Sequence, residues 1–339
     1  MIRFIVRVPV SNRVASPHAL VEAAVLADEL GFYGISVHDR LIFDGRWVAC
    51  GARDAVGDGD DRDVYEALVT LSFLAARTQR VRLLTAVLLL PLREPILLAK
   101  QVSVLDVLSG GRMILGVGVG SQPPAKTQRA EVIDSRIRGA NVSKEYATLD
   151  VPAARGAFAD EAIDALRAIW TSAKATYHGR FVRFEEIDVF PKPVQQAGPP
   201  IIVGGGSLAA LRRVARRGDG WLPNLLQPEQ YRESIAQLGR LSAGAGRSPA
   251  IHGLNIFTCV ASTDDAAMTI FRPTMAKLFS DKDLSEMNLV GSPASVVARL
   301  KDYEAAGVDL VELKPVYRSV PELLEMMRVI ARDVAPAFA

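Results

Sequence analysis

Two kinds of apolar pattern alternate along this chain. The clearest case is the stretch 80–120, in which an almost wholly apolar run over Val81–Leu90 precedes apolar residues at helical spacing and a second apolar run over Met113–Val119. Runs rich in Val and Leu are typical of strands buried on both faces. Pro95 suits the first turn of the intervening helix, and two glycines at 110–111 suit its end. The stretch therefore predicts two parallel strands joined by a helix.

The same alternation continues over most of the chain. Eight strands are expected, at Ile2–Val8, Tyr33–Val37, Val81–Leu90, Met113–Val119, Pro200–Val203, Gly220–Leu222, His252–Val260 and Val308–Leu313. Helices are expected around them, at Pro17–Leu30, Val64–Arg77, Pro95–Leu108, Ala154–Trp170, Leu208–Arg217, 228–242, 264–280, Pro293–Ala306 and Val320–Val334. Residues Ala175–Phe190 alternate instead and suggest a short hairpin. Eight strands alternating with helices over about 300 residues favour a (β/α)8 TIM barrel over a doubly wound sheet.

Three long connections, 41–63, 121–142 and 171–198, interrupt this alternation. Each follows an expected strand or adjoins the loop after one, so we expect insertions at the mouth where the strands have their C-terminal ends. No internal repeat or low-complexity linker indicates a domain boundary. Residues 1–339 are therefore expected to form a single domain.

Composition and charge argue against several classes of partner. The 339 residues include 40 basic and 38 acidic side chains, for a net charge of +2, so neither nucleic acid nor a membrane surface is expected. No apolar stretch reaches the roughly 20 residues of a membrane span. The first residues resemble a signal sequence, but Arg3, Arg7 and Pro9 indicate a strand instead. Two cysteines, Cys50 and Cys259, are too few for a disulfide framework. A cytoplasmic protein is expected.

Polar residues gather at the expected C-terminal ends of strands, where barrels of this type hold their active sites. That rule selects Val8-Pro9, 38–40, Ala86-Val87, 118–121, 204–207, 221–224 and Lys314. The densest polar group is His38, Asp39 and Arg40. His38 could transfer a proton near neutral pH, and Asp39 could accept a hydrogen bond. Alternatively, Asp39 and Arg40 only pair with each other to brace a loop.

A glycine-rich loop follows the expected fifth strand, with the sequence Gly204, Gly205, Gly206, Ser207. Backbone N–H groups, a hydroxyl and the positive end of the following helix together favour a bound phosphate. Three glycines can also simply make a tight turn between a strand and a helix, so the loop alone leaves both interpretations open.

Alternate glycines also mark the expected fourth strand. Gly116, Gly118 and Gly120 lie on one face of it, where they allow close packing or, near the strand end, a flat slot for a planar ring.

The four histidines fall far apart without metal-binding spacing, so no metal site is expected. No GxSxG motif supports a serine nucleophile, and Cys259 lies in an apolar strand and is expected in the core.

Taken together, these segments resemble the bacterial luciferase-like family of flavin- and deazaflavin-dependent oxidoreductases. The resemblance covers nearly the whole chain and is strongest over 65–120. It continues through KEYATLDVPAARG (144–156), HGRFVRF (178–184), FPKPVQQAGPPIIVGGGS (190–207), RRGDGWLP (216–223) and GSPASVVARLKDYEAAGVDLVEL (291–313). The segments are specific in combination, whereas any one alone would not be.

The resemblance implies a flavin-like ring at the C-terminal mouth of a (β/α)8 barrel, above a non-proline cis peptide at Ala86–Val87. The family's Asp-His pair after the second strand corresponds to Asp39-Arg40, with His38 one place early. Its Glu-aromatic pair corresponds to Glu145-Tyr146, delayed here by the extra segment 121–142. The expected catalytic residues are His38, Asp39 and Glu145. The expected cofactor-binding residues are Asp39, Arg40, Ala86, Val87, Gly118, Gly120, Gly204, Gly205, Gly206 and Ser207.

Within the family, the pattern LPLREPILLAK…DVLSGGRMILGVGVG and an Arg-rich, Lys-poor composition resemble the branch that uses coenzyme F420, an 8-hydroxy-5-deazaflavin. That branch implies hydride transfer between the deazaflavin C5 and a small organic substrate, with a polar residue handling the proton. The alternatives are an FMN-dependent monooxygenase, which needs a site shielded from water, and a non-catalytic flavin-binding barrel. The resemblance also implies a homodimer formed through early barrel helices.

Overall fold

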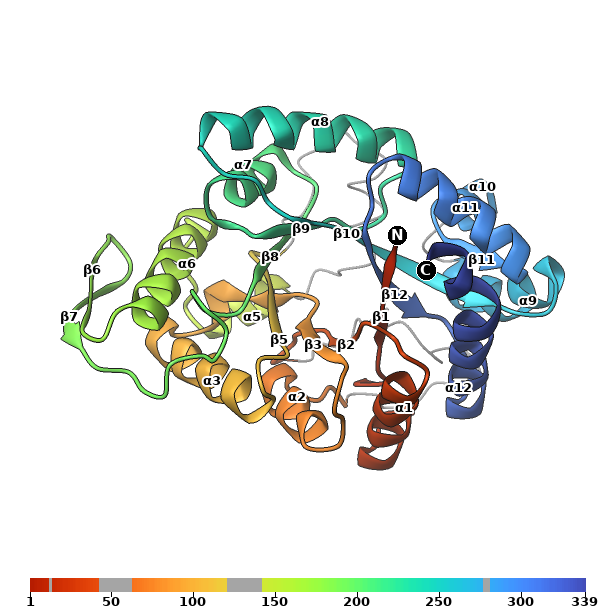
Figure 1. Cartoon of the computed structure of the whole chain (residues 1–339), viewed down its shortest axis with the longest axis horizontal. Coiled ribbons are helices and arrows are strands. Elements are labelled where there is room, and N and C mark those ends of the chain that lie inside the picture. The colour runs from red at the N-terminus through yellow and green to blue at the C-terminus, as the bar shows by residue number, and fades with distance from the viewer. Residues whose placement is uncertain (12–13, 43–62, 121–141, 277–280) are drawn as a thin grey trace.

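Eight parallel strands close into a barrel, as the alternation predicts (Figure 1). The computed structural model describes residues 1–11, 14–42, 63–120, 142–276 and 281–339. The barrel strands are β1 (Arg3–Arg7), β2 (Gly34–Val37), β3 (Arg82–Thr85), β5 (Met113–Gly118), β8 (Ile201–Gly204), β9 (Gly220–Leu222), β10 (Ile251–Val260) and β12 (Leu310–Pro315). They pair in this order, and β12 pairs with β1 to complete the ring. The expectation of a (β/α)8 barrel is confirmed.

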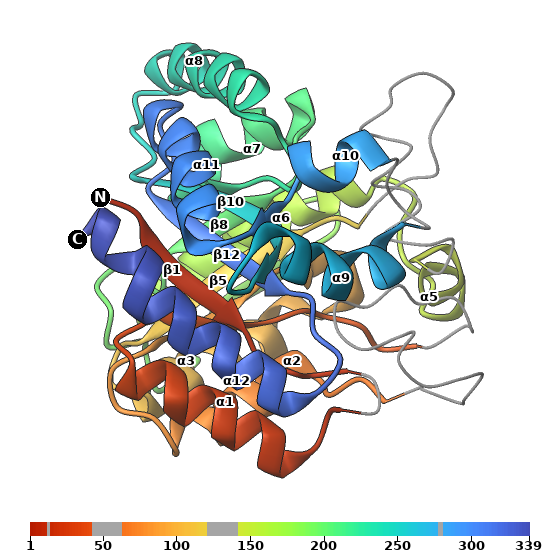
Figure 2. The same ribbon diagram turned by 90° about the vertical axis from the view of Figure 1, so that its right-hand side faces the viewer.

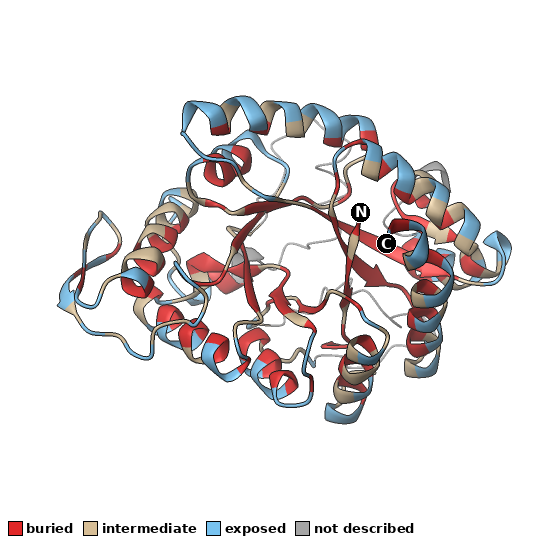
Figure 3. Cartoon of the chain, viewed as in Figure 1, coloured by how far each residue is buried: buried red, intermediate tan, exposed pale blue. Residues whose placement is uncertain are grey.

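Helices cover the outside of the barrel, with their buried faces toward the strands (Figure 3). The long ones are α1 (Pro17–Glu29), α2 (Ala67–Ala75), α3 (Pro95–Leu108), α6 (Arg155–Thr171), α7 (Leu208–Arg217), α8 (Pro228–Gly244), α9 (Asp264–Met275), α11 (Pro293–Ala305) and α12 (Val320–Val329). Five of them, α1, α3, α8, α11 and α12, have proline in their first two positions, where the missing N–H is tolerated. None of the helices in the described ranges is both long and apolar enough to cross a membrane.

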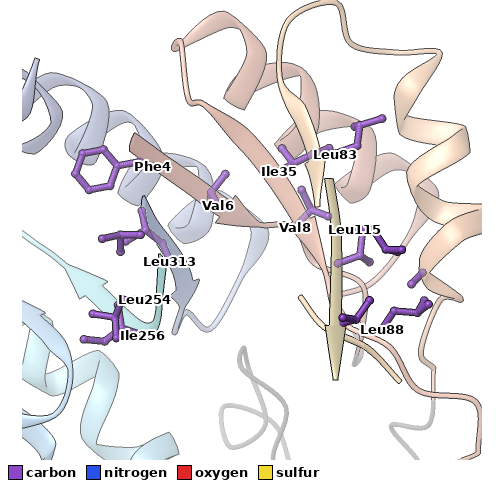
Figure 4. Packing of buried hydrophobic residues seen from close by; sticks show 14 of the residues in the cluster. Phe4, Val6, Val8, Ile35, Leu83, Leu88, Leu115, Leu254, Ile256 and Leu313 are labelled. Atoms are coloured by element: carbon purple, nitrogen blue, oxygen red, sulfur yellow. The ribbon is translucent and has the colours of Figure 1, made fainter. Parts of the chain in front are cut away.

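The core has two layers because successive strand residues point to opposite faces. Outward-facing residues such as Phe4, Ile35 and Leu83 belong to the large cluster shared with the helices (Figure 4). A smaller cluster fills the barrel interior and takes residues from six of the eight strands or their ends: Ile5, Leu84, Ala86, Ile114, Ile202, Leu222 and Leu310. This inner layer forms the floor beneath the C-terminal mouth.

Three expected elements differ from those observed, and one observed strand was not expected. The run Val81–Leu90 is not one strand: β3 ends at Thr85 and a separate β4 (Leu88–Leu89) pairs with β5. The helix expected at 64–77 begins only at Ala67, because Glu66 caps it and Tyr65 bonds to Val10 instead.

Beyond β10, the helix expected at 264–280 ends at Met275, and a separate short helix, α10 (Asp281–Glu286), follows. The strand β11 (Leu289–Gly291), which pairs with the end of β10, was not expected. Three residues are too few to show a period in the sequence.

The predicted hairpin is confirmed as β6 (Ala175–His178) paired antiparallel with β7 (Arg183–Ile187). The closing helix continues past α12 as one π-helical segment, Ile330–Val334, and one 3-10 segment, Ala335–Phe338. Both chain ends lie at one end of the barrel, and α5 (Val142–Thr148) and α10 lie at the other (Figure 2). Of the expected mouth insertions, residues 43–62 and 121–141 lie outside the described residues.

Candidate functional site

A polar layer lies inside the barrel, on the C-terminal side of the inner apolar cluster. Alternation places Arg7 of β1 and both Glu312 and Lys314 of β12 on the interior face, because Ile5 and Leu310 of the same strands belong to the inner cluster. Glu312 is fully buried and Lys314 is 4% exposed. The charged side chains of Arg7, Glu312 and Lys314 therefore lie between the inner apolar cluster and the C-terminal mouth.

Arg7 and Glu312 form a buried ion pair that spans neighbouring strands. The Arg7 Nε donates to Glu312 Oε1 at 3.0 Å, and the Ser36 hydroxyl of β2 donates to the same oxygen at 2.5 Å. The Arg7 Nη2 also donates to the backbone carbonyl of Ala86, at 3.1 Å. The pair thus connects β12, β1 and β2 to the segment that follows β3.

Lys314 extends the polar layer toward the far wall of the barrel. Its ammonium donates to Asn224 Oδ1 at 2.5 Å and lies 3.9 Å from the centre of the Phe257 ring. Asn224, which follows β9, forms a β-bridge with Asn255 of β10. The rule that active sites lie at the C-terminal ends of the strands (the strand-end rule) selects both Lys314 and Asn224. The structure brings the two together.

His38 follows β2 and has both ring nitrogens buried, although the residue as a whole is only partly buried. Burial lowers the pKa of His38 well below its ordinary value, and the positive charges of Arg7, Arg40 and Lys314 lower it further. The imidazole is therefore neutral at pH 7, which is the form that accepts a proton.

Asp39 and Arg40 each pair with another residue rather than with each other. Asp39 accepts a hydrogen bond from the Leu89 N–H at 2.9 Å and another from Arg93. Burial raises the pKa of Asp39, and the nearby Arg93 opposes that rise. The Arg93 Nη1 also lies 2.9 Å from Glu66 Oε1, at the N-cap of α2. Asp39 thus fixes the backbone at Leu89 in position.

Arg40 pairs with Glu145, which lies on α5 and is fully buried. One Glu145 oxygen accepts from Arg40 at 2.8 Å, and the other accepts from the backbone N–H groups of Leu41 and Ile42 at 2.7 and 2.9 Å. Three donors therefore already engage this carboxylate. The geometry favours Glu145 as an anchor between α5 and the chain after β2, rather than as a group that moves a proton.

The Ala86–Val87 peptide is cis, as the resemblance implies. A Cβ at Gly118 would lie 2.7 Å from Val87 Cγ2, and one at Gly204 would lie 3.0 Å from Val87 Cγ1. These two glycines make room for Val87, so its methyl groups fill the space that was expected to form a flat slot beside Gly118. Gly116 allows close packing instead, because its Cβ would lie 2.0 Å from the Thr85 carbonyl oxygen.

The end of β5 meets α5 near Gly120, which has a positive φ of 71°. The Tyr146 hydroxyl donates to the Val119 carbonyl at 2.8 Å, and the Arg155 guanidinium lies 4.7 Å from the Tyr146 ring centre. Glu145 and Tyr146 therefore place α5 at the C-terminal mouth, close to the exit of β5.

The loop after β8 has the geometry expected of an anion-binding loop. Gly205 has a φ of +100°, a conformation that favours glycine, and the Trp221 indole donates to its carbonyl at 2.7 Å. Ser207 caps α7 by accepting from the Ala210 N–H at 3.2 Å, and Gly206 and Ser207 are exposed. The first turn of α7 contains no acidic residue. Its N-terminus is therefore open to a phosphate.

Arg7, Ser36 and Glu312 are not among the residues expected from the sequence. A signal was present: the charges in RFIVR and in LVELKP interrupt otherwise apolar strands at alternate positions, which places them on one face. In a strand buried on both faces, such charges face the barrel interior.

Cys259 is in the core as expected, where burial raises the pKa of its thiol to about 12. Within the described ranges, no three His, Cys, Asp or Glu side chains gather as metal ligands.

Several known proteins are similar to this chain in sequence. An uncharacterised protein of Mycobacterium tuberculosis is 32% identical over 253 residues, which cover 73% of this chain and 81% of the relative. An FMNH(2)-dependent dimethylsulfone monooxygenase of Pseudomonas putida is 25% identical over 297 residues, 76% of each chain. An F420-dependent glucose-6-phosphate dehydrogenase of Microbacterium testaceum is 28% identical over 229 residues, 66% of this chain and 58% of the relative.

The fold is shared with solved structures. An F420-dependent secondary alcohol dehydrogenase in complex with an F420-acetone adduct superposes with a TM-score of 0.79 and 16% identity, covering 100% of this chain and 99% of that one. The family model described as luciferase-like monooxygenase matches residues 3–278. The chain belongs to the luciferase-like monooxygenase family, whose members are flavin- or F420-dependent oxidoreductases.

Proposed function

We propose that this chain is a coenzyme F420-dependent oxidoreductase that transfers a hydride between the deazaflavin C5 and a small organic substrate. The observation that carries the proposal is the His38 imidazole at the C-terminal mouth: both of its ring nitrogens are buried, and burial and the charges of Arg7, Arg40 and Lys314 lower its pKa. When a carbon bound to oxygen gains or loses a hydride, the oxygen gains or loses a proton and passes through partial negative charge. A neutral base can exchange the proton with this oxygen, and fixed positive charges beside it can stabilise the partial negative charge.

The residues present also fit the phosphate of such a cofactor. At the open N-terminus of α7, the backbone of Gly205, Gly206 and Ser207 would hold the phosphate. The Ser207 hydroxyl oxygen already accepts a hydrogen bond from Ala210, but its hydrogen remains able to donate. When bound, the cofactor would supply the carbon that carries the hydride. The chain itself would supply the backbone that holds the phosphate and, at His38, the group that takes or returns the proton.

The remaining cofactor contacts are proposed at three places around the mouth. Ala86 and Val87 would lie beneath the ring, with Gly118 and Gly204 holding Val87 in place. Asp39 and Arg40 would act mainly through the segments that they fix, and Gly120 would contribute the exit of β5. The similarity to the F420-dependent dehydrogenase of Microbacterium testaceum supports this choice of cofactor.

An FMN-dependent monooxygenase is the second candidate. It is favoured by one observation, namely that the FMNH(2)-dependent relative aligns over more of this chain, 76% against 66%. The same glycine loop would serve the phosphate of FMN. A non-catalytic barrel is expected to have lost the polar groups at its strand ends, whereas His38, Asn224 and Lys314 are still present.

Titration of the purified protein with oxidised F420 and, separately, with FMN tests the choice of cofactor. Absorbance and fluorescence report binding of each. We expect tight binding of F420 and weak binding of FMN; the reverse order would assign the chain to the monooxygenases. Riboflavin is the matched control for the loop, because it lacks the phosphate and should bind more weakly than FMN. A protein that binds none of the three would contradict both candidates.

We also propose a homodimer formed through α2 and α3. Val69 and Phe73 lie one turn apart on α2 and are 69% and 39% exposed, while Leu97 and Leu108 share a face of α3 and are 57% and 71% exposed. Exposed apolar residues on adjacent helices are typical of subunit contacts. Light scattering after gel filtration should give twice the mass of the chain. The variant Val69→Glu should reduce the measured mass to that of a single chain. Leu149→Glu, at an exposed leucine after α5, should leave the dimer intact.

A further inference from the structure

The segment 86–89, between β3 and the end of β4, is held from two sides by buried acid–arginine pairs. On one side, Asp39 accepts from the Leu89 N–H and pairs with Arg93. On the other, Arg7 donates to the Ala86 carbonyl and pairs with Glu312. In both pairs the carboxylate side chain is 0% exposed, and the arginines are 12–13% exposed. Two separate pairs therefore fix the backbone on either side of Val87.

We propose that Arg7, oriented by Glu312 and Ser36, is a positioning residue for the cofactor. The proposal rests on the proposed function, in which Ala86 and Val87 lie against the ring. Arg7 uses two different nitrogens for its two acceptors, 3.0 Å from Glu312 and 3.1 Å from Ala86. The rigid fork of a guanidinium can serve two acceptors at fixed positions, which an ammonium cannot do in the same way.

Val87 follows this contact directly in the chain and packs closely against two glycines. Its two methyl groups occupy the places where side chains at Gly118 and Gly204 would stand. The Ala86 N–H is also fixed, since it donates to the Val37 carbonyl at 2.7 Å. A displaced Ala86 carbonyl would therefore shift Val87, the residue that the proposed function places against the ring.

Glu312 has a feature that a purely structural ion pair does not need. One of its oxygens, Oε1, accepts from both Arg7 and Ser36, while Oε2 is buried and has no hydrogen-bond partner among the described residues. An unsatisfied buried carboxylate oxygen is costly, and apolar residues of similar size often replace buried ion pairs without loss of stability. The pair is thus better explained by what it positions than by what it adds to stability.

The double variant Arg7→Met/Glu312→Met separates positioning from stability. Removing both charges leaves no unpaired ion, so the melting temperature should stay near that of the wild type. The Ala86 carbonyl loses its charged donor, so cofactor affinity should fall by roughly tenfold or more. The absorbance and fluorescence of the bound cofactor should also shift. Arg3→Met is the matched control, because Arg3 pairs with Asp309 between the same two strands at the opposite end of the barrel; it should leave affinity and spectrum unchanged.

Wild-type protein is titrated first, with oxidised F420 and with FMN. If it binds neither, the proposed function is wrong and the positioning role falls with it. If it binds one of them and the double variant binds that cofactor with the same affinity and spectrum, the positioning role alone is wrong. Should the double variant not fold, Arg7→Lys decides the question. It keeps a charge opposite Glu312 but lacks the two separate nitrogens with which Arg7 reaches its two acceptors. Unchanged binding by this variant would overturn the proposal.

Discussion

Gly205→Asp is expected to weaken binding of F420, or of FMN, by roughly a hundredfold or more. Two like charges about 4 Å apart near a protein surface repel by about 4 kcal/mol, which salt reduces in part, and each 1.4 kcal/mol corresponds to about tenfold in affinity. The new carboxylate would stand in the loop where the phosphate is proposed, at a residue with a φ of +100°. Fluorescence titration of the variant with each cofactor measures the loss.

Two further variants separate charge from backbone conformation. Gly205→Ala adds only a Cβ at the same positive φ, so its effect on affinity should be much smaller. Gly246→Asp places the same side chain at another glycine with positive φ, 65°, which has open space around it at the end of α8. It should bind the cofactor as the wild type does. Unchanged affinity in Gly205→Asp would show that the loop is only a turn between β8 and α7.

His38→Gln is expected to lower kcat by about a hundredfold to ten-thousandfold, the range typical of a lost general acid or base. Cofactor affinity should stay close to wild type, because the proposed phosphate loop is formed by other residues. The other two expected catalytic residues are engaged elsewhere, Asp39 by Leu89 and Arg93, and Glu145 by Arg40 and two backbone N–H groups. His178→Gln, at the exposed hairpin, is the control and should retain full activity.

The pH dependence of the wild type gives an independent check. Because burial and neighbouring cations lower the pKa of His38, its neutral form persists when the pH falls below 6.5. Activity that needs the neutral imidazole should therefore stay level through pH 6.5 and decline only at more acidic values. A decline centred at the ordinary histidine pKa would contradict the lowered pKa of His38. A variant His38→Gln with wild-type kcat would show that His38 takes no part in the reaction.

Much of the barrel could be predicted because its signals are local. Each strand and helix has its own period and its own end signals, such as Pro95 and the glycines at 110–111. Interruptions within an apolar run and very short strands could not be predicted in the same way. The apolar run 81–90 looks continuous although the backbone turns at Ala86–Val87, and the three-residue β11 is too short to show any period.

The site was predicted less completely than the fold. The strand-end rule found His38, Lys314 and the glycine loop, because in this barrel every strand's C-terminal end lies at one mouth. It could not show that Asp39 pairs with Arg93, 54 residues away, or that Arg40 pairs with Glu145, 105 residues away. It also missed Arg7 and Glu312, which are 305 residues apart and meet only because β1 and β12 are neighbours where the barrel closes.

The sequence by itself determined the architecture, the family and the end of the barrel at which the chemistry is expected. These follow from periodic patterns, turn residues and motif segments, all of which act over short distances along the chain. Only the tertiary structure decided which charged groups meet, which of them are already engaged, and that Val87 fills the space beside Gly118 and Gly204. The physical reason is that pairing and steric fit depend on distances across the closed barrel, which no local pattern encodes.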